Sequence, residues 1–441
     1  MIRTALLLLV ATAPVAAAQD SPLRLTLGEA VRRAAGDAPS VTLAGLRTEA
    51  ALARVRQQRA ALLPSLGLGA GWLNRTFNRA SLGFDFPTPP GTQPPPDLIG
   101  PFGNVDARLR FTQPLFDWAG LVRVRAARAQ QSATAADGVV AAEAAAQATA
   151  VAYLQAARAG ALVSAGEADS ALAMELVDLA RAQLEADVAT PLDVTRARTQ
   201  LVAAREGLVL ARNQLARARV ELARTLGLPA RTALDLGEPL SDDLARAPVP
   251  PVGEQAVELA LTRRADLQAE TVRLRAAEQG VLAALAERVP RVDLAADYGV
   301  NGRTGPDAIA TRQVSVQVSV PILDGFRREG RIAEQRVARR EAEIRRTELE
   351  REIAAQVAIA LLELGSAGAR SSIVRERLRL AEDELAQSRE RFTAGVAGNI
   401  EVINAQVSLL LARDAEIEAR FAAATARVAL ARAAGVAREI R

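Results

Sequence analysis

The chain has 441 residues, of which 50% are hydrophobic but only 3% aromatic, and its formal net charge is +4. His and Cys are both absent, which excludes disulfide bonds, a lipidated cysteine, metal sites built from these residues and catalysis by imidazole or thiol groups. A composition rich in Ala, Arg and Glu favours long, closely packed helices, and the interleaving of Arg with Glu and Asp is typical of solvated helix faces.

The first eighteen residues are typical of a secretory signal peptide. Arg3 provides the positive start, Ala5–Val10 the apolar stretch and Ala16–Ala18 the small residues of a cleavage site. The apolar stretch is too short to span a bilayer, so we expect residues 1–18 to be removed and the mature chain to begin near Gln19. Export also argues against a nucleic-acid partner.

The second half of the chain repeats the first. Gln113–Asp117 matches Val320–Asp324 at an offset of 207 residues, and Leu192–Val194 matches Ile400–Val402 at an offset of 208. So constant an offset over a long stretch indicates an internal duplication.

The duplication predicts two structural repeats, residues 19–230 and 231–441. In each repeat we expect a helix, a strand, a loop, a second strand, a long helix, a turn and another long helix. The first repeat is the longer one because it contains a Pro-rich stretch, Pro87–Pro101, which predicts a long surface loop.

Four segments alternate between apolar and other residues, two in each repeat. Their apolar positions are Leu66, Leu68, Ala70 and Trp72; Val105, Ala107, Leu109 and Phe111; Val292, Leu294, Ala296 and Tyr298; and Val314, Val316, Val318 and Val320. This period fits the strands of a membrane barrel and equally those of a soluble antiparallel sheet. We favour the barrel, because no other predicted strand or core covers these apolar faces. Asp106, Arg108 and Arg110 would then face the barrel lumen.

The remaining segments have the period of coiled-coil helices. From Val194 to Thr225, an apolar residue recurs every seven positions with a small residue three positions later, and the 4,3 spacing returns over 353–392 and 403–431. A second seam lies on the first of these helices, at Val202, Val209, Ala216 and Ala223. Two seams on one helix indicate a neighbour on each side, as in a cylinder of helices.

Four strands are too few to close a membrane barrel, since known ones begin at about eight. An open sheet edge in lipid leaves backbone groups without partners, so strands of several chains must join. Eight strands from two chains would be filled by side chains. We therefore expect three chains and twelve strands.

These features together resemble the TolC family of outer-membrane efflux proteins. The resemblance rests on the duplicated order, on Gln113–Asp117 between strand and helix, and on the hairpin with Gly395 and Ile400–Val402, and it covers nearly the whole mature chain. It implies a mostly α fold with a small β part, in which three chains form a long coiled-coil tunnel and a twelve-stranded barrel. It also implies a location in the outer membrane of a Gram-negative bacterium, with a large periplasmic portion.

The resemblance further implies a passive conduit for efflux or type I secretion, which contacts outer-membrane lipid and docks on a periplasmic adaptor joined to an inner-membrane pump. The family closes its tunnel at the hairpin tips, where the constriction positions fall on Asp193, Glu401 and Asn404. A gate-locking pair of Tyr and Arg falls on Phe392 and Ala397, which cannot form the same hydrogen bond. The residues expected to meet the adaptor are Ala186, Val188, Ala394, Gly395 and Val396.

A second interpretation of the tips is purely structural. Thr190-Pro191-Leu192-Asp193 is a helix-start signal, with Thr as N-cap and an acid near the helix dipole. Asn399 is expected to cap the other hairpin in the same way. For Asp193 capping and pore lining remain open together, whereas pore lining is favoured for Glu401.

Other classes of protein fit less well. A periplasmic coiled-coil adaptor needs one hairpin between small β-rich domains, and a structural coiled-coil protein needs neither the signal peptide nor the strands. An enzyme is not expected, because the chain has no Gly-rich phosphate loop and no G-x-S-x-G motif. No cofactor, metal or nucleic acid is expected.

Overall fold

The computed structural model describes residues 22–82, 91, 96–249, 253–303 and 305–441. The predicted signal peptide, residues 1–18, lies outside the described residues, as does much of the Pro-rich stretch 87–101. The described residues form two compact units, and each contains segments from both halves of the chain. The hairpin unit consists of the described residues up to Thr42, Ala141–Arg264 and Ile353–Arg441. The sheet unit consists of the described residues of Leu43–Val140 and Ala265–Glu352.

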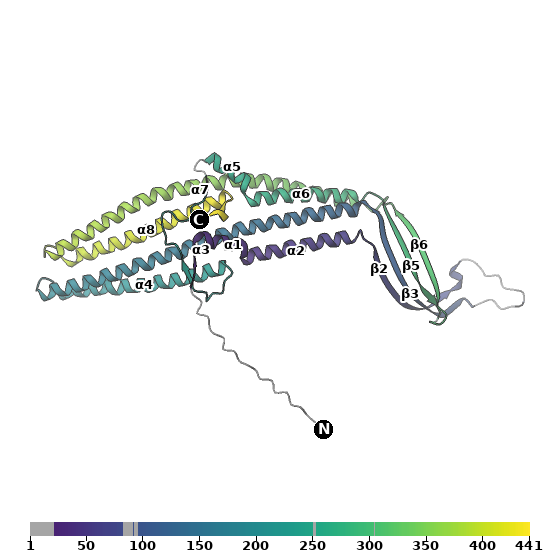
Figure 1. The fold of residues 1–441 in the computed structure, drawn as a ribbon, viewed down its shortest axis with the longest axis horizontal. Helices are drawn as coiled ribbons and strands as arrows, with labels where there is room; N and C mark the ends of the chain where they lie inside the picture. Colours follow the sequence, from purple (N-terminus) through teal and green to yellow (C-terminus); the bar gives the residue numbers. More distant parts are fainter. Residues whose placement is uncertain (1–21, 83–90, 92–95, 250–252, 304) are drawn as a thin grey trace, which may run out of the picture. The chain divides into compact units, whose positions relative to one another are not determined.

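Figure 1 labels the helices and strands along the chain. In order they are β1 Leu23–Leu25, α1 Leu27–Asp37, α2 Pro39–Ala60, β2 Ser65–Asn78, β3 Leu98–Asp117, α3 Trp118–Glu185, α4 Pro191–Thr225, β4 Leu234–Leu236, α5 Gly253–Arg263, α6 Ala265–Ala286, β5 Arg291–Gly302, β6 Ile309–Ser319, α7 Arg327–Thr393 and α8 Asn399–Ala433, with short 3-10 turns at Arg79–Leu82 and Ala437–Glu439. The expected fold, mostly helical with a small β part, is confirmed.

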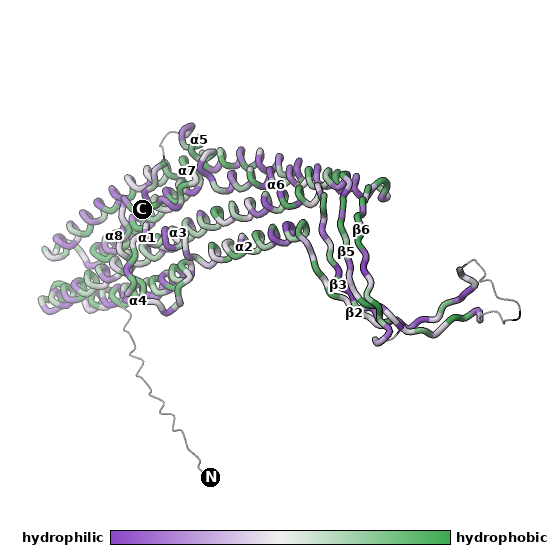
Figure 2. Tube along the Cα trace, turned by 45° about the vertical axis from the view of Figure 1, so that its right-hand side comes forward, coloured by the Kyte–Doolittle hydropathy of each residue, from purple (hydrophilic) through white to green (hydrophobic). Residues whose placement is uncertain are grey.

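The four expected strands form one antiparallel sheet in the sheet unit, in the order β2-β3-β5-β6. The register places apolar residues of neighbouring strands opposite one another, as Leu68 with Leu109, Leu109 with Tyr298, and Leu294 with Val316. Apolar and polar residues alternate along the strands in Figure 2. Because successive side chains point to opposite faces, one face of the sheet is apolar from edge to edge.

This apolar face is exposed in the single chain. The Leu68 side chain is 80% exposed, and Val314, Val316 and Val318 on β6 are exposed as well. One boundary differs from the sequence expectation. Leu98–Pro101, predicted as part of the loop, belongs to β3, because these residues continue its pairing with β2 from Leu98 opposite Asn78.

The two matching segments at the strand-to-helix junctions perform the same structural task. Asp117 precedes α3, and its carboxylate accepts hydrogen bonds from the Gly120 amide at 2.6 Å and from Arg123 at 3.1 Å. Asp324 precedes α7 and accepts from Arg328 at 2.8 Å. A carboxylate beside the first turn of a long helix satisfies free N–H groups and interacts favourably with the helix dipole.

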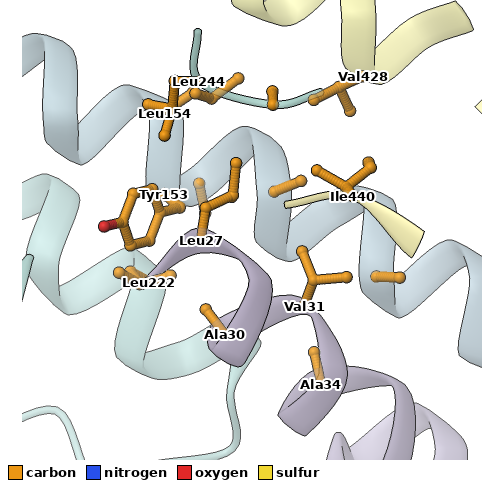
Figure 3. Packing of buried hydrophobic residues seen from close by; sticks show 14 of the residues in the cluster. Leu27, Ala30, Val31, Ala34, Tyr153, Leu154, Leu222, Leu244, Val428 and Ile440 are labelled. Carbon is orange, nitrogen blue, oxygen red and sulfur yellow. The ribbon is translucent and has the colours of Figure 1, made fainter. Parts of the chain in front are cut away.

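The hairpin unit contains the main hydrophobic core, around Tyr153 (Figure 3). Leu27 and Val31 of α1, Leu154 of α3 and Leu222 of α4 are buried there. The Tyr153 hydroxyl donates to the carbonyl oxygen of Leu25 at 3.1 Å and accepts from the Glu238 amide at 3.2 Å. The hydroxyl thus joins β1 to the segment that follows β4. The two strands β1 and β4 form a parallel pair that the sequence analysis did not predict.

The long helices end as two hairpins, α3 with α4 and α7 with α8 (Figure 1). The predicted heptad seam of α4 faces α3, because Val194, Ala197 and Leu201 are buried against Val177 and Ala180. The 68 residues of α3 correspond to about 100 Å of helix at about 1.5 Å per residue.

Candidate functional site

The two hairpin tips have the same backbone design. In the first, Asp187 has a φ of 56°, and in the second Gly395 has a φ of 74°. The Val188 amide donates to the Gln183 carbonyl at 2.9 Å, and the Val396 amide donates to the Arg391 carbonyl at 3.0 Å. A left-handed residue that ends the helix lets the chain reverse within a few residues.

The tips expose small and apolar side chains. The five positions predicted to contact an adaptor are all exposed in the single chain: Ala186, Val188, Ala394, Gly395 and Val396. Together they form the tip patch. A Cβ atom added to Gly395 would lie 3.7 Å from Cγ1 of Val188, so the tips of the two hairpins lie side by side.

Asp193 acts as a helix-start residue in this chain. Its carboxylate accepts hydrogen bonds from the Thr190 amide at 3.0 Å and the Thr190 hydroxyl at 2.7 Å, with Arg196 at 3.9 Å. The hydroxyl and amide of Thr190 hold the pKa of Asp193 below its ordinary value, with a smaller contribution from Arg196. Thr190 is the N-cap residue of α4 and Pro191 follows it, as predicted.

Glu401 and Asn404 lie on α8 just after the second tip. The Glu401 carboxylate forms an ion pair with Arg391 at 3.0 Å, and both side chains remain partly exposed. Asn404 is exposed. Within the described residues, no hydrogen bond or ion pair joins Asp193, Glu401 and Asn404 to one another, so a single chain supplies them as separate polar groups near the tips.

Phe392 and Ala397, the expected gate positions, differ in their surroundings. Phe392 is buried in a cluster with Leu176 of α3, Leu385 of α7 and Val402 of α8. Ala397 is half-buried in the turn. Phe392 therefore joins the two hairpins by apolar packing, where a tyrosine hydroxyl would form a hydrogen bond.

Two amide side chains join the hairpins at the tips, a role that the sequence analysis predicted for neither of them. Gln183 of α3 donates through Nε2 to the Phe392 carbonyl at 2.8 Å. Asn399, which is only 2% exposed, donates through Nδ2 to the Asp193 carbonyl at 2.8 Å. Arg389 and Glu175 add an exposed ion pair at 3.0 Å. We call Gln183 and Asn399 the tip amides.

The expectation that Asn399 caps α8 is wrong. The N-cap residue is Gly398, and no side chain caps it. Asn399 is already the first helical residue, and its amide crosses to the other hairpin because the two tips lie within reach of each other. The sequence shows only that residue 399 carries an amide near a helix start, and this residue type is equally typical of an N-cap.

The polar face of the sheet carries a charged row. Arg108 forms ion pairs with Asp106 at 2.6 Å on its own strand and with Asp297 at 2.8 Å on β5. Arg110 of β3 lies opposite Asp297 in the register but is exposed. The three predicted lumen residues, Asp106, Arg108 and Arg110, thus share the face opposite the apolar one, and Asp297 joins them.

The functional groups that these surfaces present are carboxylates, guanidinium groups and amides. Among the described residues, no group of three or more Asp and Glu side chains is arranged to hold a metal ion. Several exposed charged side chains on α7 pair with neighbours along the same helix, as Arg379 does with Glu376 and Asp383. Such exposed pairs keep the helix surface soluble and contribute little stability.

Comparison with known proteins identifies the class. The family model described as outer membrane efflux protein matches residues 30–228 and 256–436. The search of curated proteins found no match.

Several solved outer-membrane proteins share the fold. VceC from Vibrio cholerae is 23% identical, with a TM-score of 0.74 over 93% of this chain and 96% of its own. The CmeC channel of Campylobacter jejuni is 15% identical, with a TM-score of 0.74 over 93% of this chain and 86% of its own. The MtrE channel of Neisseria gonorrhoeae, solved in an open state, is 18% identical, with a TM-score of 0.73 over 94% of this chain and 90% of its own.

The family and the fold are those of channel proteins. The match covers most of both halves of the chain, including the strands of the sheet and both helical hairpins. The chain therefore belongs to the outer membrane efflux protein family, as an outer-membrane channel subunit with a large periplasmic helical part.

Proposed function

We propose that three copies of this chain form one conduit, closed in the membrane as a twelve-stranded barrel. The observation that carries the proposal is the four-stranded sheet, whose outer strands β2 and β6 pair on one side only and whose apolar face is exposed. In lipid the backbone groups of both edges need partners, and strands of neighbouring copies supply them.

Exposed apolar stripes in the hairpin unit support the same assembly. The predicted second seam of α4 is exposed over much of its length, with Val202 at 64%. On α7, Ile359, Leu362 and Ile373 are exposed, with Leu362 at 74%. Two different surfaces of this kind form a head-to-tail interface, which closes into a ring when the rotation between copies allows it.

The apolar stretch of α7 belongs to this argument. It is long and apolar enough to cross a membrane, yet only 28% of it is buried in the single chain. We assign it to packing against a neighbouring copy, because the same helix continues on both sides as a charged coiled-coil helix.

We further propose that the conduit works with a periplasmic adaptor and an inner-membrane pump, and performs no chemistry itself. The tip patch is the surface for the adaptor, because it combines small and apolar exposed residues with a hydrogen-bonded turn at the end of each hairpin. The charged row of Asp106, Arg108 and Arg110 lines the barrel lumen and influences which solutes pass.

The proposed constriction lies at the hairpin tips. Glu401, Asn404 and Asp193 from three copies line it, with Asp193 also serving as a helix-start residue. The tip amides and the buried Phe392 hold the hairpins together and so favour the closed arrangement.

The test is to purify the mature protein from outer membranes in detergent, determine its native mass and record conductance in planar bilayers. A trimer that forms discrete channels, with conductance altered by Glu401→Ala, supports the barrel and the constriction. Glu221→Ala, at a partly exposed glutamate far along α4 that also pairs with an arginine, is the matched control and leaves conductance unchanged. A monomeric, water-soluble protein without conductance refutes the channel and favours a coiled-coil adaptor or structural protein.

A further inference from the structure

A hollow of about 470 Å³ lies on the sheet unit, where β2 ends, β3 begins and β5 ends. These strand ends are the ones that do not lead into α2, α3 or α6. The walls of the hollow include Arg75 of β2, Phe102 and Asn104 of β3, Asn301 of β5 and Arg303 directly after β5. Its volume falls in the range of small-molecule sites, about 300–1,000 Å³.

The hollow lies on the polar face of the sheet. Arg75 is opposite Phe102 in the register, and Asn301 is opposite Asp106. Since side chains alternate between the two faces, Phe102 and Asn104 share the face of Asp106. A solute in the hollow is therefore on the opposite side of the sheet from the exposed apolar face.

Two guanidinium groups in the hollow have no anionic partner. The Arg75 guanidinium carbon lies 5.4 Å from the centre of the Phe102 ring. Within the described residues, neither Arg75 nor Arg303 forms an ion pair or a side-chain hydrogen bond. A guanidinium that stacks on a ring keeps the N–H groups at its edge available for a ligand.

The neighbouring carboxylates do not neutralise these two arginines. Among the described residues, no Asp or Glu lines the hollow. Asp106 of β3 and Asp297 of β5, on the same face, both pair with Arg108, at 2.6 Å and 2.8 Å. The hollow thus keeps two positive charges that the nearby acids of the sheet leave uncompensated.

We propose that this hollow binds the phosphate group of a small solute. Arg75 and Arg303 donate from the two strands that flank β3, and a planar guanidinium fits phosphate oxygens with paired hydrogen bonds. The amide groups of Asn104 and Asn301 supply further donors. A dianion matches the two unpaired charges better than a singly charged anion does. Phe102 acts as a positioning residue, because its ring holds the Arg75 guanidinium over the hollow.

The binding depends only on residues of one chain, so it is tested without channel recording. Only the placement of the site, at the end of the barrel lumen away from the helices, rests on the proposed function. The purified full-length protein, in a detergent without phosphorus, is added to glycerol 3-phosphate at about pH 7.5, where the phosphate is mostly a dianion. We expect saturable broadening of the solute's phosphorus NMR signal, reversed by sulfate and not by the same concentration of nitrate.

Variants locate the site. Arg75→Gln and Arg303→Gln are each expected to weaken the affinity about tenfold, as for the loss of a charge-assisted hydrogen bond. The matched control is Arg110→Gln, which removes an exposed arginine from the same face of β3 outside the hollow and leaves the affinity unchanged.

Phe102 is tested by a conservative pair of variants. Phe102→Leu is expected to weaken the affinity about threefold, because Arg75 loses its stacking partner, whereas Phe102→Tyr keeps the ring and the affinity. Native mass and circular dichroism of each variant show that it is folded.

A lipid headgroup carries the same phosphate chemistry, so the source is tested separately. Phosphatidic acid in mixed micelles is not expected to displace glycerol 3-phosphate, because the apolar face that contacts lipid is the opposite one. Displacement by this lipid would overturn the assignment to a solute. The site itself is overturned if the wild type shows no saturable binding, if nitrate competes as well as sulfate, or if Arg110→Gln weakens binding as much as Arg75→Gln and Arg303→Gln.

Discussion

The tip amides offer the sharpest test of how the proposed constriction is held closed. Replacing Asn399 by Leu keeps a similar side-chain volume but removes the hydrogen bond to the Asp193 carbonyl, and Gln183→Leu removes the bond to the Phe392 carbonyl. Both bonds join the α3–α4 hairpin to the α7–α8 hairpin, so both are lost if the hairpins separate.

The size of the effect follows from the two bonds. A neutral hydrogen bond contributes about 0.5–1.5 kcal/mol net, so the double variant loses about 1–3 kcal/mol of closed-state stability in each chain. A difference of about 1–3 kcal/mol corresponds to a shift of about 5–150-fold in the ratio of open to closed tips. The buried packing of Phe392 remains and limits the effect.

The assay is single-channel recording in planar bilayers, with the two single variants and the double variant measured as a cycle. We expect the open fraction to rise in each single variant and to rise most in the double variant. Gln387→Leu, which removes an exposed amide on α7, is the matched control and leaves the open fraction unchanged. If the double variant conducts like the wild type while remaining trimeric, the tip amides do not hold the gate.

Three further predictions concern other parts of the chain. Tyr153→Phe leaves the Glu238 amide without its acceptor in the core, so we expect the free energy of unfolding to fall by about 1–3 kcal/mol in a denaturant titration. The control Tyr298→Phe, at an exposed tyrosine, is expected to change it by less than about 0.5 kcal/mol. Asp414→Asn removes a carboxyl group whose pKa burial raises in the folded protein. The wild type therefore loses stability as the pH rises from the ordinary value of 3.8 through the raised pKa. In thermal melts at a series of pH values, we expect the variant to have a flatter pH profile and a higher melting temperature at neutral pH. Val188→Asp combined with Val396→Asp places two charges on the tip patch. We expect this double variant to lose co-purification of a periplasmic adaptor and to lose efflux in cells, while its trimer mass and conductance persist. Normal efflux by the double variant would contradict the proposed docking surface.

Much of the secondary structure could be predicted from the sequence, because periodicity is a local property of the backbone. Alternation with a period of two located β5 and β6, and the heptad period predicted the seam of α4 that packs on α3. The start of α4 at Thr190-Pro191 was predicted from capping preferences alone. Each of these features depends on residues within a few positions of one another.

The tertiary structure decided how distant segments meet. The sheet joins the two halves through β3 and β5, and the strand pair β1–β4 brings together residues about half the chain apart, with no periodic signal in either. The same holds at the tips. Asn399 has the residue type of a cap, yet it donates to Asp193 of the other hairpin because the two tips lie against each other, and Gln183 does the same toward Phe392. A side chain capable of several hydrogen bonds takes the partner that packing brings within reach, and only the folded chain determines which partner that is.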